Sequence, residues 1–308
     1  MIGRNELAIV QAVVYASIFD YPLTLEQLRA TLVGGTMSAE QILATYESSA
    51  RLRAIVEYRD GFFVPAGRSD LIRERRRRER HSRQFLRHHG RLLRWICAIP
   101  FTRMVALSGS IAHLNMDENG DLDLFIVARG HHVWSVTVAV VLLTKILRAR
   151  RVVCANFVMS DTNLVVEQQD LFTANQILHL RPLIGREVLD GFLAANPFVR
   201  RFYPNQPASP ADSVLKAFDT DIGPWRRRLK ALLEFALAPV SPLIEWMCRR
   251  AYSWHLRRRS VAWTSPEQVR LQPDYLKLHT KSHRRSVLER FDEEVEVAIG
   301  RGERAAIA

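Results

Sequence analysis

Asp121 and Asp123 are the residues of this sequence whose type and spacing are best suited to chemistry. They stand at alternate positions of an apolar run, and residues at i and i+2 of a strand point to the same face of a sheet. Two like charges on one face need a cationic partner. Paired carboxylates suit Mg²⁺ or Mn²⁺, hard ions that take oxygen ligands and are completed by water and substrate phosphates. The spacing therefore predicts a metal site.

The apolar run before the aspartates ends in Ser108-Gly109-Ser110. A glycine at the end of a strand lets backbone N–H groups approach an anion closely, and the Ser110 hydroxyl adds a donor for a terminal phosphate oxygen. We therefore expect the bend to hold a nucleotide and the following strand to hold its metal ion.

The order Gly109-Ser110, ten intervening residues, then Asp121-Leu122-Asp123 resembles the minimal nucleotidyltransferases of the DNA polymerase beta superfamily, over about residues 100 to 165. The resemblance implies that Asp121 and Asp123 are the catalytic metal ligands and that Gly109 and Ser110 bind the nucleotide. It implies Mg²⁺-dependent transfer of a nucleoside monophosphate from a nucleoside triphosphate (NTP) to an acceptor. The sequence leaves open whether that acceptor is protein, RNA, a sugar or a small antibiotic-like molecule.

The sequence departs from the family pattern at two places. His113 stands where many small members have an arginine, and no third carboxylate is evident on the later strand. Asn156 is the central polar residue of that strand, and Asp161 lies just past its end. Three alternatives follow: Asp161 swings in, the substrate brings its own base, or the domain binds a nucleotide without transferring it.

The elements around this motif predict an α+β core. Strands are expected over 102–108, 121–128 and 150–160, with a largely buried helix over 131–149, so a mixed sheet covered by helices is the simplest arrangement. From residue 170 to 185 and onward the pattern looks helical. We assign residues 100–202 to a nucleotidyltransferase-like domain.

The first 68 residues have the pattern of a winged helix. Helical periodicity over 5–19 is followed by two helix starts at Thr24 and Ser38, each with glutamine in capping-box register, and then by a hairpin at Asp60-Gly61. Such a module binds DNA or docks on protein. The candidate recognition helix, 38–50, carries Glu40 and Glu47, a poor match to phosphates.

Two further regions complete the chain. Residues 69–99 are expected to form a basic connecting helix, in which Gly90 is the position most liable to interrupt it. Its arginines either bind phosphates or form a solvated face. A proline-rich linker over 203–212 opens a helical C-terminal region, 203–308. Within it, 225–259 is expected to form a helical pair that packs on the core, with peripheral membrane contact as the alternative.

The amino-acid composition indicates which kinds of partner the protein binds. The 308 residues carry a formal net charge of +12, which favours a polyanionic partner such as nucleic acid, a nucleotide or an acidic membrane. Three widely spaced cysteines encode no disulfide framework and favour the cytoplasm. The rival to a transferase is a nucleotide-sensing or DNA-binding regulatory protein with a degenerate catalytic domain.

Overall fold

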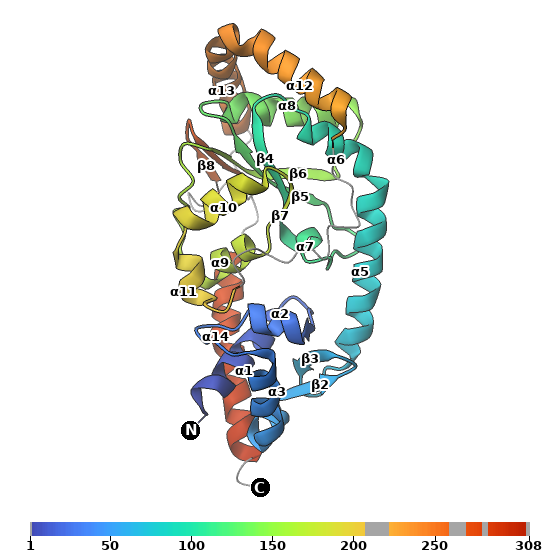
Figure 1. Ribbon diagram of the computed structural model, residues 1–308, viewed down its shortest axis with the longest axis vertical. Coiled ribbons are helices and arrows are strands. Elements are labelled where there is room, and N and C mark those ends of the chain that lie inside the picture. Colours follow the sequence, from blue (N-terminus) through green and yellow to red (C-terminus); the bar gives the residue numbers. More distant parts are fainter. Residues whose placement is uncertain (1, 207–221, 259–268, 279–282, 306–308) are drawn as a thin grey trace.

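The strand that follows Asp121, β5 (Leu122–Ala128), lies inside a six-stranded mixed sheet with the order β7-β4-β5-β6-β9-β8 (Figure 1). The computed structural model describes residues 2–206, 222–258, 269–278 and 283–305. β5 and β6 pair in parallel, and the other neighbouring strands pair antiparallel. The other strands are β4 (Thr102–Leu107), β6 (Val153–Ser160), β7 (Arg181–Ile184), β8 (Val269–Leu271) and β9 (Tyr275–Leu278).

Both faces of this sheet are covered, which explains why β5 is apolar at nearly every position. Leu124 and Ile126 face a core with α6 (Gly90–Cys97) and α8 (Val133–Ile146). The alternate residues Phe125 and Val127 face the opposite core, which includes side chains of helices that follow β6 in the chain. These helices are α9 (Leu171–Leu178), α10 (Arg186–Ala195) and α11 (Phe198–Phe202). The mixed α and β architecture predicted for the core is confirmed.

The N-terminal region forms a separate small sheet with helices. Its three strands have the order β1-β3-β2, and the tight turn between β2 and β3 places Asp60 and Gly61 at φ 51° and 83°. Thr24 and Ser38 close the predicted capping boxes at the starts of α2 and α3. The elements are α1 (Arg4–Ser17), β1 (Leu23–Thr24), α2 (Leu25–Ala30), α3 (Ala39–Ser48), α4 (Ala50–Ile55), β2 (Val56–Arg59) and β3 (Phe62–Pro65).

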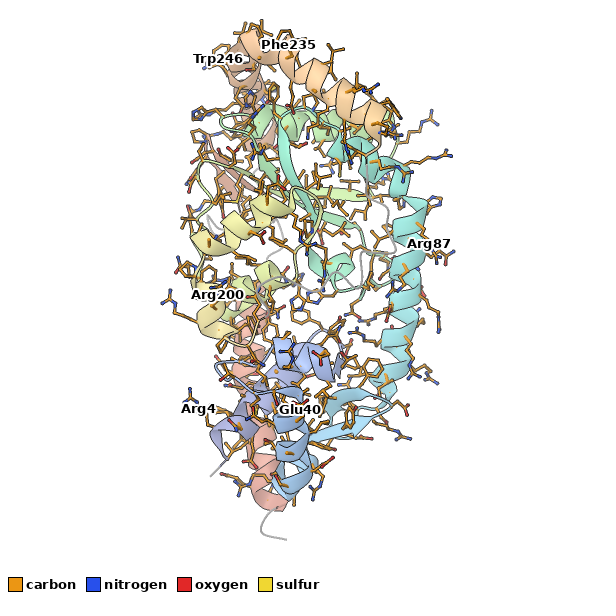
Figure 2. The ribbon with its side chains drawn as sticks, in the orientation of Figure 1. Arg4, Glu40, Arg87, Arg200, Phe235 and Trp246 are labelled. Carbon is orange, nitrogen blue, oxygen red and sulfur yellow. The ribbon has the colours of Figure 1, made fainter. Side chains whose placement is uncertain are left out.

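The basic connecting helix is confirmed and breaks where predicted. α5 (Asp70–His88) ends at His88, His89 caps it, and α6 begins at Gly90. Several arginines of α5 pair with glutamates one turn away, such as Arg78 with Glu74 at 2.8 Å. Arg87 points away from the protein (Figure 2). These contacts fit a solvated helix face better than a phosphate grip.

The C-terminal region is not purely helical, so that prediction is wrong in part. β8 and β9 extend the central sheet beyond β6, which a sequence pattern cannot reveal for short strands that pair with a distant edge. The helical prediction for 170–185 also fails at its end, because β7 pairs with β4 as an edge strand that tolerates Pro182. Positions 207–212 of the predicted linker lie outside the described residues.

The predicted helical pair is α12 (Pro224–Leu237) and α13 (Ser241–Arg258), joined by the 3₁₀ turn η1 (Ala238–Val240). By length and composition alone, Pro224–Arg258 is the one stretch within the described ranges that is long and apolar enough to cross a membrane. It folds as two helices that meet at an angle rather than as one straight rod (Figure 1).

The last helix, α14 (Arg284–Ala305), returns to the N-terminal region and packs against α1 and α4. Gly302 is buried there, and a Cβ at this position would lie 2.5 Å from Ile55 Cδ1 and 2.9 Å from Arg51 Cγ. Gly300, two residues earlier, has space for a Cβ, since the nearest atom would be 3.7 Å away on Arg304.

These two glycines give a matched test of the packing. Each alanine substitution gains about 0.5–1 kcal/mol of helix propensity. Gly302→Ala additionally crowds α4, so we expect its free energy of unfolding to fall about 1–3 kcal/mol below that of Gly300→Ala in urea titrations. Equal stabilisation by both alanines would show that α14 does not pack on α4 in this way.

Candidate functional site

The two aspartates lie on one face of the sheet, next to a thiol. Asp121 directly precedes β5 and Asp123 is its second residue, on the same side as Phe125. One ligand atom each from Asp121, Asp123 and Cys154 lie within 4.8 Å of one another. The structure thus brings together the predicted metal ligands and adds a residue that the sequence reasoning missed.

The Gly109 bend is built against Asp123. The Ser108 N–H donates to the Asp123 carbonyl at 2.9 Å, which fixes the bend beside β5. Gly109 has φ +62°, and a Cβ there would overlap Asp123 Oδ2 and lie 3.1 Å from its Cγ. Glycine is therefore needed both for the left-handed backbone and for the space that the carboxylate fills. Ser110 follows, exposed and facing the same pocket.

The surroundings of Asp121 favour its protonated form. Burial raises the pKa of the Asp121 carboxyl above its ordinary value, and the negative charge of Asp117 adds to this. A hydrogen bond with Cys154 acts in the opposite direction. A divalent cation bound between Asp121 and Asp123 would favour the ionised carboxylates, and the donor set fits such an ion.

Asp161, which the sequence suggested as a possible third site residue, does not lie at the site. Because β5 and β6 are parallel, with Asp123 opposite Cys154 and Ala128 opposite Ser160, Asp161 lies at the other end of the sheet from the aspartates. There its Oδ1 accepts the Gly130 N–H at 2.7 Å, so its role is to fix a turn. The side chain of Asn156 lies outside the described residues.

The strand positions contain a signal that could have identified Cys154 as a neighbour of Asp123. It is the second residue of β6, just as Asp123 is the second residue of β5, and equivalent positions of parallel neighbours lie side by side. The prediction of the strand from residue 150 hid this register, because β6 begins only at Val153.

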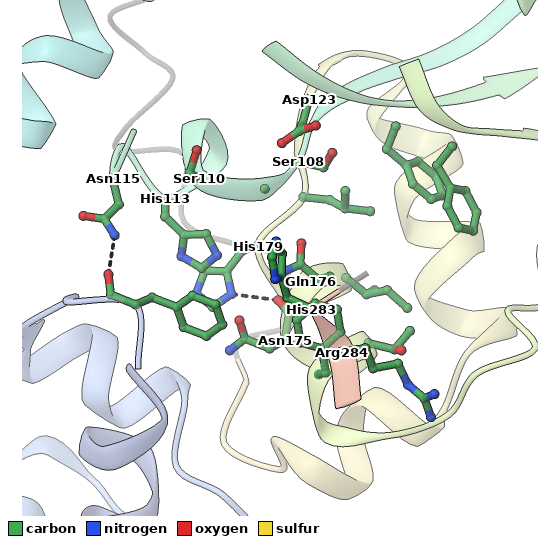
Figure 3. A pocket seen from close by; sticks show the side chains of 18 of the residues that line it. Ser108, Ser110, His113, Asn115, Asp123, Asn175, Gln176, His179, His283 and Arg284 are labelled. Atoms are coloured by element: carbon green, nitrogen blue, oxygen red, sulfur yellow. Dashed lines mark hydrogen bonds between the residues drawn. The ribbon is translucent and has the colours of Figure 1, made fainter. Parts of the chain in front are cut away.

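A pocket of about 640 Å³ opens beside these groups (Figure 3). One wall comes from the central domain and includes the bend and the aspartates, and the opposite wall comes from α1 and β1 of the N-terminal region. α9 and the C-terminal segment complete it. Lining side chains include Tyr15, Phe19, Tyr21, Phe125, Phe157, Asn175, His179, Tyr203, Lys277 and Arg284. Sequence reasoning missed this pocket, because four distant segments form it.

The N-terminal region is held against the central domain by packed rings. Tyr21 contacts His113 edge to face at 5.4 Å, and His113 lies over His179 at 4.0 Å. Arg75 of α5 lies 3.6 Å from the Tyr21 ring centre and donates to the Pro22 carbonyl at 3.1 Å. His113 thus contributes to this contact between the N-terminal region and the central domain.

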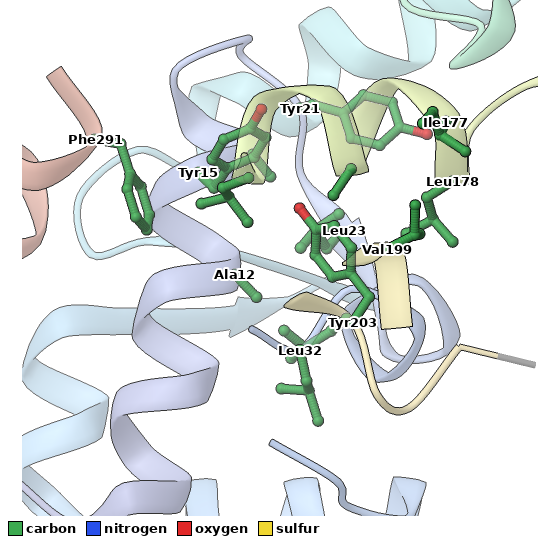
Figure 4. Packing of buried hydrophobic residues seen from close by; sticks show 14 of the residues in the cluster. Ala12, Tyr15, Tyr21, Leu23, Leu32, Ile177, Leu178, Val199, Tyr203 and Phe291 are labelled. Carbon is green, nitrogen blue, oxygen red and sulfur yellow. The ribbon is translucent and has the colours of Figure 1, made fainter. Parts of the chain in front are cut away.

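A second contact lies deeper, around the buried tyrosines Tyr15 and Tyr203 (Figure 4). The Tyr15 ring meets Phe291 of α14 edge to face at 5.5 Å. Tyr203 accepts a hydrogen bond from Asn175 of α9 at 3.1 Å. Helices from the start, middle and end of the chain therefore share one apolar core beneath the pocket.

No protein-family model matches this chain, and comparisons with curated proteins and with solved structures find no match.

The two stacked histidines make stability depend on pH. Burial lowers the pKa of His179 to about 4, with Arg181 and Arg75 adding to the effect and the Asn175 carbonyl opposing it, and burial next to His179 lowers the pKa of His113. Between about pH 6.5 and 4 the unfolded chain binds a proton at His179 that the folded chain does not. The free energy of unfolding should therefore fall as the pH is lowered through this window.

Between neutral pH and pH 4, we expect the free energy of unfolding to fall less in His179→Gln than in the wild type. The difference should reach up to about 3 kcal/mol. The measurement is urea unfolding of both proteins across that range. His88→Gln, which changes an exposed histidine, is the matched control and should follow the wild-type slope. If His179→Gln also follows it, the two rings are not buried together.

Proposed function

We propose that this protein is a divalent-cation-dependent nucleotidyltransferase that acts on a small acceptor. The observation that carries the proposal is the convergence of Asp121 and Asp123 with the Gly109 bend at one side of the pocket. Carboxylates that can hold a cation and a bend that can receive phosphate oxygens are the two parts that this reaction needs. A cytoplasmic location, where NTPs occur, is part of the proposal.

Each residue has a defined task in this reaction. Asp121 and Asp123 would hold Mg²⁺ or Mn²⁺, and such an ion, when bound, neutralises triphosphate charge. The backbone of the Gly109 bend would approach the phosphates, and Ser110 would donate to one of their oxygens. The acceptor oxygen forms a bond to the α-phosphorus, and the bond between the α-phosphorus and the bridging oxygen breaks. The acceptor proton passes to the departing pyrophosphate or to solvent, since no third carboxylate of the described residues joins the pair.

The finer fold assignment is also a proposal. The order β4, a short helix α7 (Gly109–Ala112), β5, α8 and β6, with a parallel β5–β6 pair, supports a nucleotidyltransferase-like core. The order of α1 to β3 and their β1-β3-β2 sheet supports a winged helix. We propose that this winged helix closes a substrate pocket and does not read DNA, because its α3 exposes Glu40 and Glu47.

The pocket supports an acceptor that is small and largely apolar. Aromatic and aliphatic side chains line most of it, and the N-terminal region covers it on one side, which leaves little access for a duplex.

The rival function is nucleotide sensing without transfer. The position of Asp161 at the far end of β6 favours it, because the transferases that this chain resembles take a third carboxylate from that strand. The two functions differ in whether a covalent product forms.

Activity is tested with α-phosphate-labelled NTPs, Mg²⁺ or Mn²⁺, and a library of small hydroxyl-bearing acceptors. We expect a labelled product that falls at least about a hundredfold in Asp121→Asn and Asp123→Asn, as for loss of a principal charge-stabilising group. Asp190→Asn, which changes an exposed carboxylate on α10, should leave the rate unchanged. Cation-dependent NTP binding without any product would favour the sensor, and product formation that survives both aspartate variants would remove the assigned site.

Cys154 provides a second test, on cation choice. A thiol beside two carboxylates favours thiophilic ions over Mg²⁺. Replacing it by a carboxylate in Cys154→Asp should raise Mg²⁺ affinity on the order of tenfold, since affinity for hard cations rises with ligand charge. Calorimetric titration with Mg²⁺ and Cd²⁺ measures this, with Cys154→Ser expected to lose Cd²⁺ affinity alone. Unchanged affinities in both variants would exclude Cys154 from the cation site.

A further inference from the structure

The helical pair α12 and α13 exposes large apolar side chains of the kind that a surface helix of a soluble protein turns to its core. Such a helix turns its apolar side to the core and its charges to water. Here no residue of α12 is buried, and in α13 only Ser241 and Leu256 are. The large apolar side chains of both helices point outward instead, at one end of the molecule (Figure 2). We call this the outer face; it comprises Leu232, Phe235, Val240, Leu243, Trp246 and Met247, each at least 47% exposed.

The charged residues between them attach the pair to the protein. The Lys230 ammonium donates to the Thr102 carbonyl at 2.6 Å. Glu234 accepts the Phe101 N–H at 2.8 Å, and Glu245 accepts the N–H groups of Trp134 and Ser135 at 2.8 Å each, at the start of α8. These hydrogen bonds hold both helices along the protein, together with the packing of Leu237, Cys248, Tyr252 and Leu256 on the core. Other large apolar side chains of the pair are left outward.

The surroundings of the outer face are basic and aromatic. Arg227, Arg228, Arg249 and Arg250 are exposed at its margins. Trp225 and Trp254 are each more than half exposed, and Arg258 lies 3.7 Å from the Trp254 ring centre. α8, which packs on α13, also exposes an apolar side chain, with Ile146 at 77% exposure. Tryptophan and arginine around an apolar surface match the headgroup region of a bilayer, where rings sit between water and acyl chains and arginines meet phosphates.

We propose that the outer face binds the surface of an anionic lipid bilayer, with α12 and α13 lying in the plane of the headgroups. Insertion as a span is disfavoured by the turn at η1 and by the bonds of Lys230, Glu234 and Glu245 to the protein. Charge decides between a bilayer and a second copy of this chain: two copies meeting through this face would bring their arginines together, whereas anionic lipid neutralises them. The proposal is independent of the nucleotidyltransferase function.

The test is flotation of the full-length protein with vesicles of phosphatidylcholine alone or mixed with phosphatidylglycerol. We expect binding to the mixed vesicles that weakens with added salt, with a blue shift of tryptophan fluorescence. Replacing three outer-face residues, Leu232→Ser, Phe235→Ser and Trp246→Ser, should lower partitioning at least tenfold, given the apolar area lost.

The matched control replaces three exposed apolar residues elsewhere, Tyr58→Ser, Val165→Ser and Val297→Ser, and should bind like the wild type. Absence of wild-type binding at low salt would overturn the proposal, as would equal binding by both triple variants. Light scattering gives a third check: a wild-type dimer that the outer-face variant converts to a monomer would show that a second copy covers this face instead.

Discussion

The backbone at Gly109 passes so close to the Asp123 carboxylate that no side chain fits between them, and the rest of the site depends on this contact. The left-handed glycine turns the chain directly after β4, and the bond from the Ser108 N–H fixes the turn to β5. Asp123 is thereby held on the face that Asp121 and Cys154 also occupy. One steric constraint therefore fixes the bend against Asp123, while the β5–β6 pairing brings Cys154 beside it.

The central sheet supplies only half of the pocket, and the other half comes from chain segments far away in sequence. The ring contacts of His113 with Tyr21 and His179 hold the N-terminal region against the central domain, next to the aspartates. The hydrogen bond from Arg75 to the Pro22 carbonyl adds to this contact. α14 then packs on that region, after β9 has joined the sheet. Segments near both ends of the chain therefore line the site, while α12 and α13 lie at the end of the molecule away from the N-terminal region (Figure 1).

The sequence predicted what local patterns determine. The aspartates on one face of β5, the capping boxes at Thr24 and Ser38, the Asp60-Gly61 turn and the helix break at Gly90 all follow from spacing or backbone preference. It could not predict what long-range pairing determines. β7 and β9 are short strands whose partners lie elsewhere in the chain, and Asp161 was assigned to the site because the parallel β5–β6 register was unknown. The pocket and the outward apolar side of α12 depend on tertiary contacts alone.

The most direct measurement of the central claim is a crystal structure with Mn²⁺ and a non-hydrolysable NTP, using the anomalous signal of manganese to locate the ion. We predict a manganese peak within coordination distance of both Asp121 and Asp123, with triphosphate oxygens at the Gly109 bend. A peak elsewhere, or a triphosphate bound away from that bend, would contradict the account.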